Sequence, residues 1–327
     1  MNEITPSVRL RVVSVHKLQA LVCPRKYYWT NIRNLESKNL NVNFWWGGVS
    51  GEGWEALLMG KDWRKAMKQE DKKRCKDKRI STDVAEDMDV IRSIIEIQLE
   101  CAQQQPIFKD FKITSTQEKF AVPLKCGVLF CGTKDAVGTD QGVLTLFENK
   151  TTSQVTPAYL ESLRYGKQVN GYAWSEIKER RKDRVTQCRC CIFRKPSLRV
   201  KKDQSIEEFK DEIRCDILGG TDYRGKKREA RPDMYYRWLK FQFGAKTVRD
   251  VGRDIEQEAF DLLEKYKRAS EKQILDPYYW PRRENKCSEY AGCEFQALCK
   301  DVSRYKMYLN SFQQREMFYE QEREELK

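Results

Sequence analysis

The chain has 327 residues, of which 40% are hydrophobic and 34% are charged, and its formal net charge is +13. This composition supports a sizeable buried core, and the absence of any run of 18 apolar residues argues against a transmembrane helix and a membrane partner. The first residues lack the long apolar stretch of a secretory signal, so we expect a cytoplasmic protein whose 12 cysteines are thiols or metal ligands rather than disulfides.

Basic residues are concentrated in three runs, at 61–79, 178–184 and 224–231, and the first holds ten basic residues against four acidic ones. Together they favour nucleic acid as a partner, because each phosphate that a protein neutralises releases condensed counterions. Any one run is equally compatible with an ordinary solvated helix face. The sequence has no G-x-x-x-x-G-K-[ST] segment, so we expect no ATPase motor within it.

The first third of the chain predicts helices. Residues 14–30 predict a helix that ends in the segment CPRKYYW, with the single histidine, His16, as a structural residue near its start. A Gly-rich stretch at 45–60 leads into a second helix. Apolar residues at helical spacing predict an amphipathic helix at 84–101.

The pattern then changes to short β-rich runs at 125–138 and 142–153, which predict a hairpin. Thr156 followed by Pro157 predicts a helix start, and we expect that helix to run to about Arg180. A strand at 188–195, polar helical sequence and a long helix near 253–272 complete the pattern. The order is helices, then β-β-α-β, then helices, which predicts an α/β core with helical additions at both ends.

The predicted hairpin carries three charged residues that suggest chemistry. Asp135 lies on its first strand, and Glu148 and Lys150 share one face of the second because strand side chains alternate. A stable core avoids such charges unless they are paired or bound to metal. Carboxylate oxygens suit Mg²⁺ or Mn²⁺, and such an ion could polarise a phosphodiester and activate water. The alternative is an ordinary ion pair among solvent-facing strand residues.

The helix after the hairpin adds two polar side chains. Gln168 and Tyr172 are four residues apart, so they share one face of that helix. An amide and a phenol at this place could contact phosphate oxygens or order water around a metal. A tyrosine packed on the core beside a surface glutamine is the alternative.

With these motifs in this order, the chain resembles the PD-(D/E)XK nuclease superfamily, in the RecB-like branch of phage recombination exonucleases and CRISPR-associated iron–sulfur nucleases. Asp135 matches the metal-binding aspartate of that family, ENK at 148–150 its E-x-K motif, and QVNGY at 168–172 the Q-x-x-x-Y motif of the branch. With gaps, the resemblance covers residues from about 14 to 300.

The resemblance implies a restriction-endonuclease-like mixed sheet core, α-β-β-β-α-β, and a metal-dependent deoxyribonuclease. It implies an exonuclease in recombination, repair or phage DNA processing that acts on single-stranded or duplex DNA ends. It also implies recombination or CRISPR partner proteins and the cytoplasm of a bacterium or a phage-infected host. The implied catalytic residues are Asp135, Glu148, Lys150, Gln168 and Tyr172. Mg²⁺ or Mn²⁺ would be held by Asp135, Glu148 and the backbone carbonyl of Asn149.

Three late cysteines, Cys287, Cys293 and Cys299, stand six residues apart and form an incomplete metal site. The resemblance implies that Cys23 is the fourth ligand and that the four thiolates hold a [4Fe–4S] cluster. Steps of six turn a helix by roughly 240°, so a loop folded around Gly292 would have to bring them together. Structural zinc is the alternative, although its usual C-x2-C knuckles are missing.

The chain departs from the family at Gly51, where relatives carry a histidine. Glu52 and Glu55 are the candidates to complete the metal shell in its place. The departure leaves a second class of function open, a DNA-binding protein of the same fold with weak catalysis or none.

We expect one nuclease domain over residues 1–310, with a helical insertion at about 30–110 and a helical iron–sulfur segment at about 250–310. A charged helix or tail is expected at 311–327. The segment FWW at 44–46 could stack on unpaired bases, although at least one of its tryptophans is expected to pack inward. The candidate DNA-binding residues are Arg25, Lys26, Tyr27, Lys72, Lys73 and Arg74.

Overall fold

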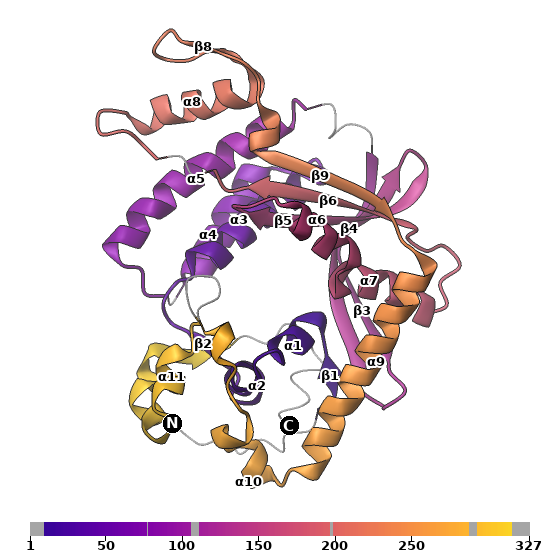
Figure 1. Ribbon diagram of the computed structural model, residues 1–327. Helices are drawn as coiled ribbons and strands as arrows, with labels where there is room; N and C mark the ends of the chain where they lie inside the picture. The colour runs from indigo at the N-terminus through magenta and orange to yellow at the C-terminus, as the bar shows by residue number, and fades with distance from the viewer. Residues whose placement is uncertain (1–9, 77, 106–110, 197–198, 288–292, 316–327) are drawn as a thin grey trace.

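A mixed sheet of six strands lies at the centre of the protein (Figure 1). The structure, a computed structural model, describes residues 10–76, 78–105, 111–196, 199–287 and 293–315. The strands run in the order β1-β4-β5-β6-β9, and β3 pairs with β4 beside that path. The β1–β4 and β5–β6 pairs are parallel and the other pairs antiparallel. The bounds are β1 Val12–Val13, β3 Phe111–Pro123, β4 Leu129–Asp140, β5 Val143–Thr152, β6 Gln187–Arg194 and β9 Tyr236–Gln242.

The predicted hairpin is present as β4 and β5. Its turn places Gln141 and Gly142 at φ of 54° and 82°, a left-handed conformation that suits tight hairpin turns. The additional strand β3 pairs along almost the whole of β4. The residue pattern predicts only the two strands of the hairpin and does not predict β3. With β3 included, the central order of elements is α5-β3-β4-β5-α7-β6.

The predicted helix at 14–30 is broken into α1 Val15–Ala20, α2 Pro24–Tyr27 and a π-helical turn, Tyr28–Ile32. Pro24 explains the break, because proline has no N–H to continue a helix and its ring clashes with the preceding turn. Cys23 therefore adopts an extended conformation and forms the N-cap of α2.

The predicted helix at 157–180 is likewise two helices, α6 Pro157–Tyr165 and α7 Lys167–Lys178. Between them Gly166 has an extended ψ of 150°. A side chain there would come within 2.5 Å of the carbonyl oxygen of Ser162, so glycine is required for this close turn. The break sets the direction of α7, which carries Gln168 and Tyr172.

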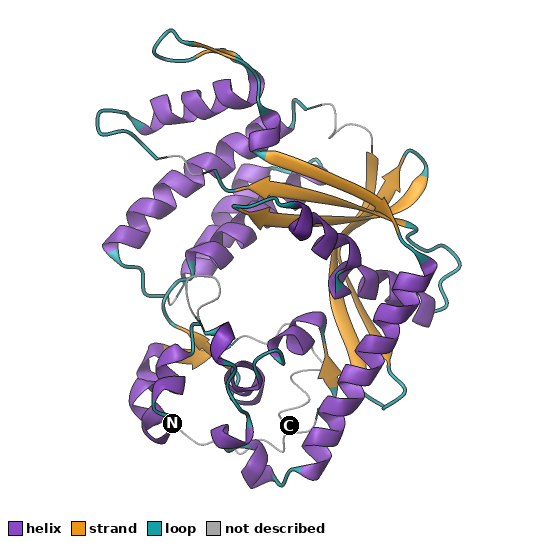
Figure 2. Ribbon diagram, in the orientation of Figure 1, coloured by secondary structure: helices purple, strands orange, loops and turns teal. Residues whose placement is uncertain are grey.

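Helices cover both faces of the sheet (Figure 2). α5, Thr82–Ala102, confirms the predicted amphipathic helix, and α9, Ala245–Arg268, begins earlier than predicted. α3 packs closely on β5, because Gly47 and Gly51 of this helix lie against Thr151 and Asn149. The other bounds are α3 Val42–Leu58, α4 Trp63–Cys75, α8 Ile206–Leu218, α10 Glu271–Ile274 and α11 Gln296–Lys300. Short 3₁₀ segments lie at Pro232–Met234, Pro277–Tyr279, Glu284–Lys286 and Val302–Ser311.

Two short strand pairs lie outside the main sheet: β7 Gly220–Thr221 with β8 Lys227–Arg228, and β2 Leu35–Ser37 with β10 Phe312–Gln314. The strand β10 corrects our expectation of a charged helix or tail from residue 311. Phe312 is buried and stacks on Phe295 with 5.5 Å between ring centroids, which anchors this strand. Residues 316–327 of the expected tail lie outside the described residues.

None of the helices in the described part of the chain has both the length and the apolar character needed to cross a membrane.

Candidate active site

Asp135 and Glu148 lie where β4 and β5 part. The paired register between these strands ends at Ala136, which follows Asp135, and at Phe147, which precedes Glu148. Beyond this point Asp135 Oδ2 accepts a hydrogen bond of 2.8 Å from the backbone N–H of Asn149. The aspartate thus bonds the neighbouring strand through its side chain where the backbone ladder stops.

Glu148, Lys150 and Gln168 form one hydrogen-bonded network. Lys150 Nζ donates to Glu148 Oε1 and, over 3.0 Å, to Gln168 Oε1. Gln168 Nε2 donates to Glu148 Oε1 over 2.7 Å and to the hydroxyl of Tyr172 over 3.1 Å. Together with Asp135, the five residues implied as catalytic by sequence motifs are therefore assembled at one place, from two strands and one helix.

The network holds more charge than its burial favours. Glu148 is 1% exposed, and burial together with Asp135 raises the pKa of its carboxyl to about 7, despite the opposing effect of Lys150. Burial also raises the pKa of Asp135. Burial alone would lower the pKa of the Lys150 ammonium, but Glu148 and Asp135 outweigh it and the net pKa is raised. Lys150 is accordingly a fixed cation, whereas the Glu148 carboxyl is poised to lose its proton near neutrality.

One atom of the network is unsatisfied. Glu148 Oε2 is buried and has no hydrogen-bond partner in the part of the chain that the structure describes, an arrangement that normally costs free energy. Asp135 and Glu148 supply the hard oxygen donors that Mg²⁺ or Mn²⁺ prefers. No group of three or more His, Cys, Asp or Glu side chains in the described residues is arranged to hold a metal. A shell based on these two carboxylates would need backbone or water ligands as well.

Glu55 on α3 belongs to the same electrostatic environment. Burial, Asp135 and Glu52 raise the pKa of its carboxyl to about 8, and Gln117 donates a hydrogen bond to it. Burial and Glu70 raise the pKa of Glu52, and Asp135 is not among its influences. Of the two glutamates that could complete a metal shell, Glu55 is the one whose pKa Asp135 influences.

Gly51 also faces the site's strand. A Cβ at this position would lie 3.4 Å from Asn149 Nδ2. Gly51 therefore lies within α3 and leaves space beside β5 rather than forming a turn.

His16 was predicted as structural, and in the structure it lies within electrostatic range of Lys150 and Asp135. Its side chain is exposed, yet desolvation by surrounding protein and Lys150 lower its pKa, while Asp135 raises it. The pairing of β1 explains this position. β1 runs parallel to β4 with Val13 opposite Phe130, and α1 follows β1 towards the end of β4 that carries Asp135. The residue pattern gave no signal for this proximity, because it depends on how β1 joins the sheet.

Two of the predicted DNA-binding residues are buried. Arg25 is 6% exposed and its Nε donates to the carbonyl oxygen of Trp280 over 2.6 Å, and Tyr27 is 1% exposed with its hydroxyl 3.2 Å from that of Tyr266. Both residues hold the C-terminal segment rather than face a ligand, so this prediction was wrong for them. The residues that bury this part of the CPRKYYW segment, Tyr266 and Trp280, are more than 200 positions later in the sequence.

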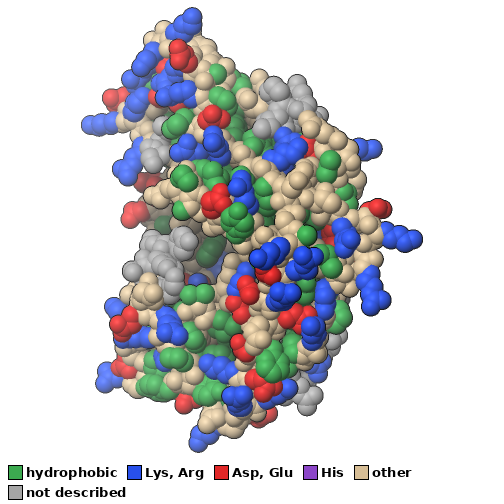
Figure 3. Space-filling model, turned by 45° about the vertical axis from the view of Figure 1, so that its right-hand side comes forward, with side chains coloured by type: hydrophobic (Ala, Val, Ile, Leu, Met, Phe, Trp, Pro, Cys, Tyr) green, Lys and Arg blue, Asp and Glu red, His purple; other side chains and the backbone are tan. Residues whose placement is uncertain are grey.

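The other candidate DNA contacts remain on or near the surface. Lys72 and Lys73 on α4 are exposed, Lys26 is half-buried, and Arg74 is half-buried with its Nε 2.6 Å from Glu70 Oε1. On the face shown in Figure 3, Lys and Arg side chains are scattered among acidic ones rather than gathered in one patch. Part of the charge of the three basic runs is paired with carboxylates, as in Lys78 with Glu36, Arg181 with Glu118 and Arg228 with Asp222.

The candidate cluster cysteines come from both ends of the chain. Cys23 and Cys293 both influence the pKa of the Cys299 thiol, which burial raises, and the backbone N–H of Cys293 donates to Cys287 O over 2.9 Å. The Cys287 thiol itself contacts the carbonyl of Arg283 at 3.7 Å. Gly292, around which the loop was expected to fold, lies outside the described residues. The electrostatic influence of Cys23 and Cys293 on Cys299 indicates that these thiols lie within range of one another, but no group of three or more cysteines in the described residues is arranged to hold a metal.

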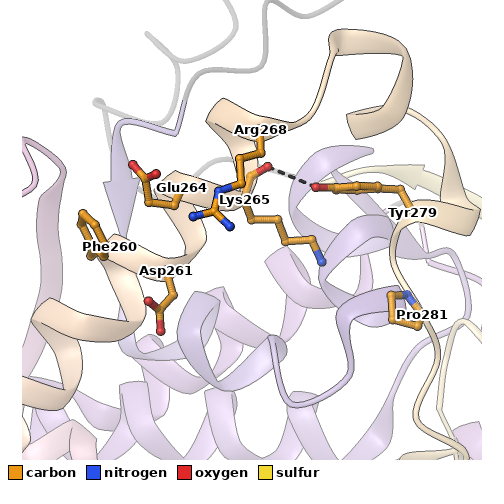
Figure 4. A pocket seen from close by; sticks show the side chains of 7 residues that line it. All are labelled: Phe260, Asp261, Glu264, Lys265, Arg268, Tyr279 and Pro281. Carbon is orange, nitrogen blue, oxygen red and sulfur yellow. Dashed lines mark hydrogen bonds between the residues drawn. The ribbon is translucent and has the colours of Figure 1, made fainter.

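Trp280 anchors this closure of the two chain ends. Lys265 of α9 lies 4.1 Å from the centre of its ring, and Tyr27 stacks on it at 5.4 Å. A depression of about 590 Å³ opens over this region, and Figure 4 shows Lys265 extending across it and Tyr279 donating to the backbone of Lys265 over 3.3 Å. The lining of the depression is Phe260, Asp261, Glu264, Lys265, Arg268, Tyr279 and Pro281. It contains none of the motif residues.

No family model matches the sequence, and no curated protein matches it. Among solved structures, one described as the crystal structure of LHK-Exo in complex with dAMP aligns with 69% of this chain and 96% of its own, at 13% identity and a TM-score of 0.27. At that TM-score the likeness supports no conclusion about fold or function.

Proposed function

We propose that the chain is a metal-dependent deoxyribonuclease that hydrolyses DNA phosphodiester bonds and acts as an exonuclease on DNA ends. The observation that supports it best is the network of Glu148, Lys150 and Gln168 beside Asp135, in which a buried carboxylate oxygen of Glu148 has no hydrogen-bond partner among the described residues. A stable sheet gains nothing from such an arrangement, whereas a phosphodiesterase needs clustered oxygen donors beside a fixed cation.

Asp135 and Glu148 would hold Mg²⁺ or Mn²⁺, with the carbonyl of Asn149 and the carboxylate of Glu55 as further donors. When bound, such an ion supplies Lewis acidity and lowers the pKa of a coordinated water. Lys150, which the carboxylates keep protonated, would stabilise the negative charge that develops on the phosphoryl oxygens. Gln168 holds the side chains of Lys150 and Glu148, and Tyr172 holds Gln168.

We further propose that Cys23, Cys287, Cys293 and Cys299 bind a [4Fe–4S] cluster that closes the two chain ends together. Four thiols of free cysteines suit this cluster, and zinc would use the same donors. The contacts of Arg25 with Trp280 and of Tyr28 with the carbonyl of Leu275, at 2.6 Å each, already hold these segments side by side. The cluster would add a covalent link to an interface that exists in the protein itself.

The test is cleavage of labelled single-stranded and duplex DNA by anaerobically purified protein, with Mg²⁺, Mn²⁺ or EDTA. We expect metal-dependent degradation from the ends that Asp135→Asn abolishes. Asp250→Asn, which alters an exposed ion pair on α9, is the matched control and should cleave normally. DNA binding without cleavage under any metal would instead assign the chain to the second class considered above, a DNA-binding protein of this fold.

A further inference from the structure

The first turn of α3 exposes one aromatic ring. Phe44 is 65% exposed, whereas its neighbours Trp45 and Trp46 are 1% and 6% exposed. Both tryptophans of the FWW segment therefore pack inward and the phenylalanine alone faces solvent. A single exposed apolar residue is ordinary on a protein surface, so its surroundings decide what it means.

Two cations flank this turn. Lys195 Nζ donates to Asn43 Oδ1 over 3.0 Å, and Arg74 Nη1 donates to the carbonyl oxygen of Phe44 over 3.3 Å. Arg74 is also paired with Glu70, but among the described residues Lys195 has no carboxylate partner. Its ammonium lies 5.0 Å from the centre of the Trp46 ring, and burial lowers its pKa to about 8. The protein has thus placed a lysine without a carboxylate partner in the described residues against Asn43 and Trp46, in the same helical turn that exposes Phe44.

The turn lies next to the proposed catalytic strand. The backbone N–H of Lys195 donates to Thr152 O over 2.8 Å, which continues the β5–β6 pairing two residues beyond Lys150. One turn after Phe44, Gly47 brings α3 against Thr151 of the same strand, where a Cβ would be 3.2 Å from its hydroxyl. Ligands of open α/β sheets bind at the carboxyl ends of parallel strands, and this is the end of the β5–β6 pair.

We propose that Phe44, Lys195 and Arg74 form a subsite for an unpaired nucleotide of a DNA strand that extends from the catalytic network. The base stacks on Phe44, and its phosphate takes the place of the missing carboxylate beside Lys195. Stacking on an aromatic ring is available to every base but requires that the base is unpaired. The inference rests on the proposed nuclease function and narrows its substrate class to single-stranded DNA or frayed ends.

The test measures equilibrium binding in EDTA, where no cleavage occurs, by anisotropy of a labelled single-stranded oligonucleotide and of a blunt duplex. We expect Phe44→Ala and Lys195→Gln each to weaken single-strand binding roughly tenfold, with a far smaller effect on the duplex. Lys195→Gln should also reduce the salt dependence of single-strand binding by about 0.7 in slope, whereas Phe44→Ala should not. Lys195→Arg keeps the charge and should retain most of the affinity.

Phe260→Ala removes another exposed aromatic side chain, 46% exposed on α9, and is the matched control. Thermal melting of each variant checks that it remains folded. If the wild type binds and degrades single strands but Phe44→Ala and Lys195→Gln bind as tightly as Phe260→Ala, the subsite is overturned while the nuclease proposal stands. If the wild type binds no DNA, both fail.

Discussion

Gln168 donates a 2.7 Å hydrogen bond to Glu148 from the first turn of α7, and the same amide accepts from Lys150 over 3.0 Å. A helix residue thereby fixes two charged residues of a neighbouring strand. The break at Gly166 makes this contact possible, because it lets α7 start in a direction that α6 does not share.

Replacing Gln168 should damage catalysis more than stability. In Gln168→Ala the side chains of Glu148 and Lys150 lose their shared partner, and misplacement of this kind commonly costs about 100-fold in rate. Single-turnover cleavage with Mn²⁺ measures it. Tyr172→Phe removes only the outer hydroxyl of the network and should cost much less. Equal rates for Gln168→Ala and the wild type would show that the network has no catalytic role.

The metal-free protein should lose stability as the pH rises. Burial and Asp135 raise the pKa of Glu148 from 4.5 to about 7, so the folded state holds a proton that the unfolded state has released. This stabilisation is complete below pH 4.5 and is lost as the pH passes through about 7, a change on the order of 3 kcal/mol. Urea unfolding in EDTA at pH 5.5 and 8.5 should detect about 2 kcal/mol of this change. Glu148→Gln should reduce the difference without removing it, because the raised pKa of Glu55, about 8, acts over the same pH range. An unchanged slope in this variant would contradict the assignment.

Metal should reverse this trend. Metal binding requires the carboxylates of Asp135 and Glu148 to be ionised. The increase in melting temperature on addition of Mn²⁺ should therefore be larger at pH 8 than at pH 6. Calorimetry in two buffers should detect proton release on binding. Asp135→Asn should lose the gain, while Asp250→Asn should keep it. A stabilisation by Mn²⁺ that persists in Asp135→Asn would place the ion elsewhere.

His16 should contribute to activity although it lies outside the motifs. Its electrostatic interaction with Asp135 and Lys150 leads us to expect that His16→Ala slows cleavage roughly tenfold without lowering the melting temperature. Gln19→Ala changes an exposed side chain on the same helix and is the control. A loss of stability without a specific loss of rate would return His16 to a structural role.

The four candidate cluster cysteines should behave as one set. Cys23→Ser and Cys299→Ser should each lose bound iron and the absorption near ~400 nm that thiolate-bound clusters show. Cys126→Ser, a half-buried cysteine between β3 and β4, should retain both. Metal analysis of the anaerobically purified protein decides between iron and zinc, and neither metal in the wild type would refute the cluster.

Strand periodicity and motif order were enough to predict where Asp135, Glu148 and Lys150 meet, because a two-residue alternation and a short turn leave few alternatives. The same reasoning missed His16, whose position depends on the parallel pairing of β1 with β4. It also misassigned Arg25 and Tyr27, because nothing local shows that Trp280 and Tyr266 bury them. Long-range partners, rather than local propensity, account for these errors.

Helix ends were the other source of error. Residues 14–30 and 157–180 each have helical composition, yet Pro24 and Gly166 divide them. Both residues are visible in the sequence, and their effect was underestimated because the flanking residues favour helix on either side. The strand β10 could not be expected from its composition, since it forms only where Phe312 meets Phe295.

The most direct test of the central claim compares cleavage and DNA affinity in Lys150→Ala. The account predicts that Lys150→Ala reduces the cleavage rate by at least about 100-fold, while its affinity for DNA in EDTA changes little. The control is Lys201→Ala, which removes an exposed lysine that pairs with Glu212 of α8. A Lys150→Ala protein that degrades DNA at the wild-type rate would contradict the assignment of this network as the catalytic site.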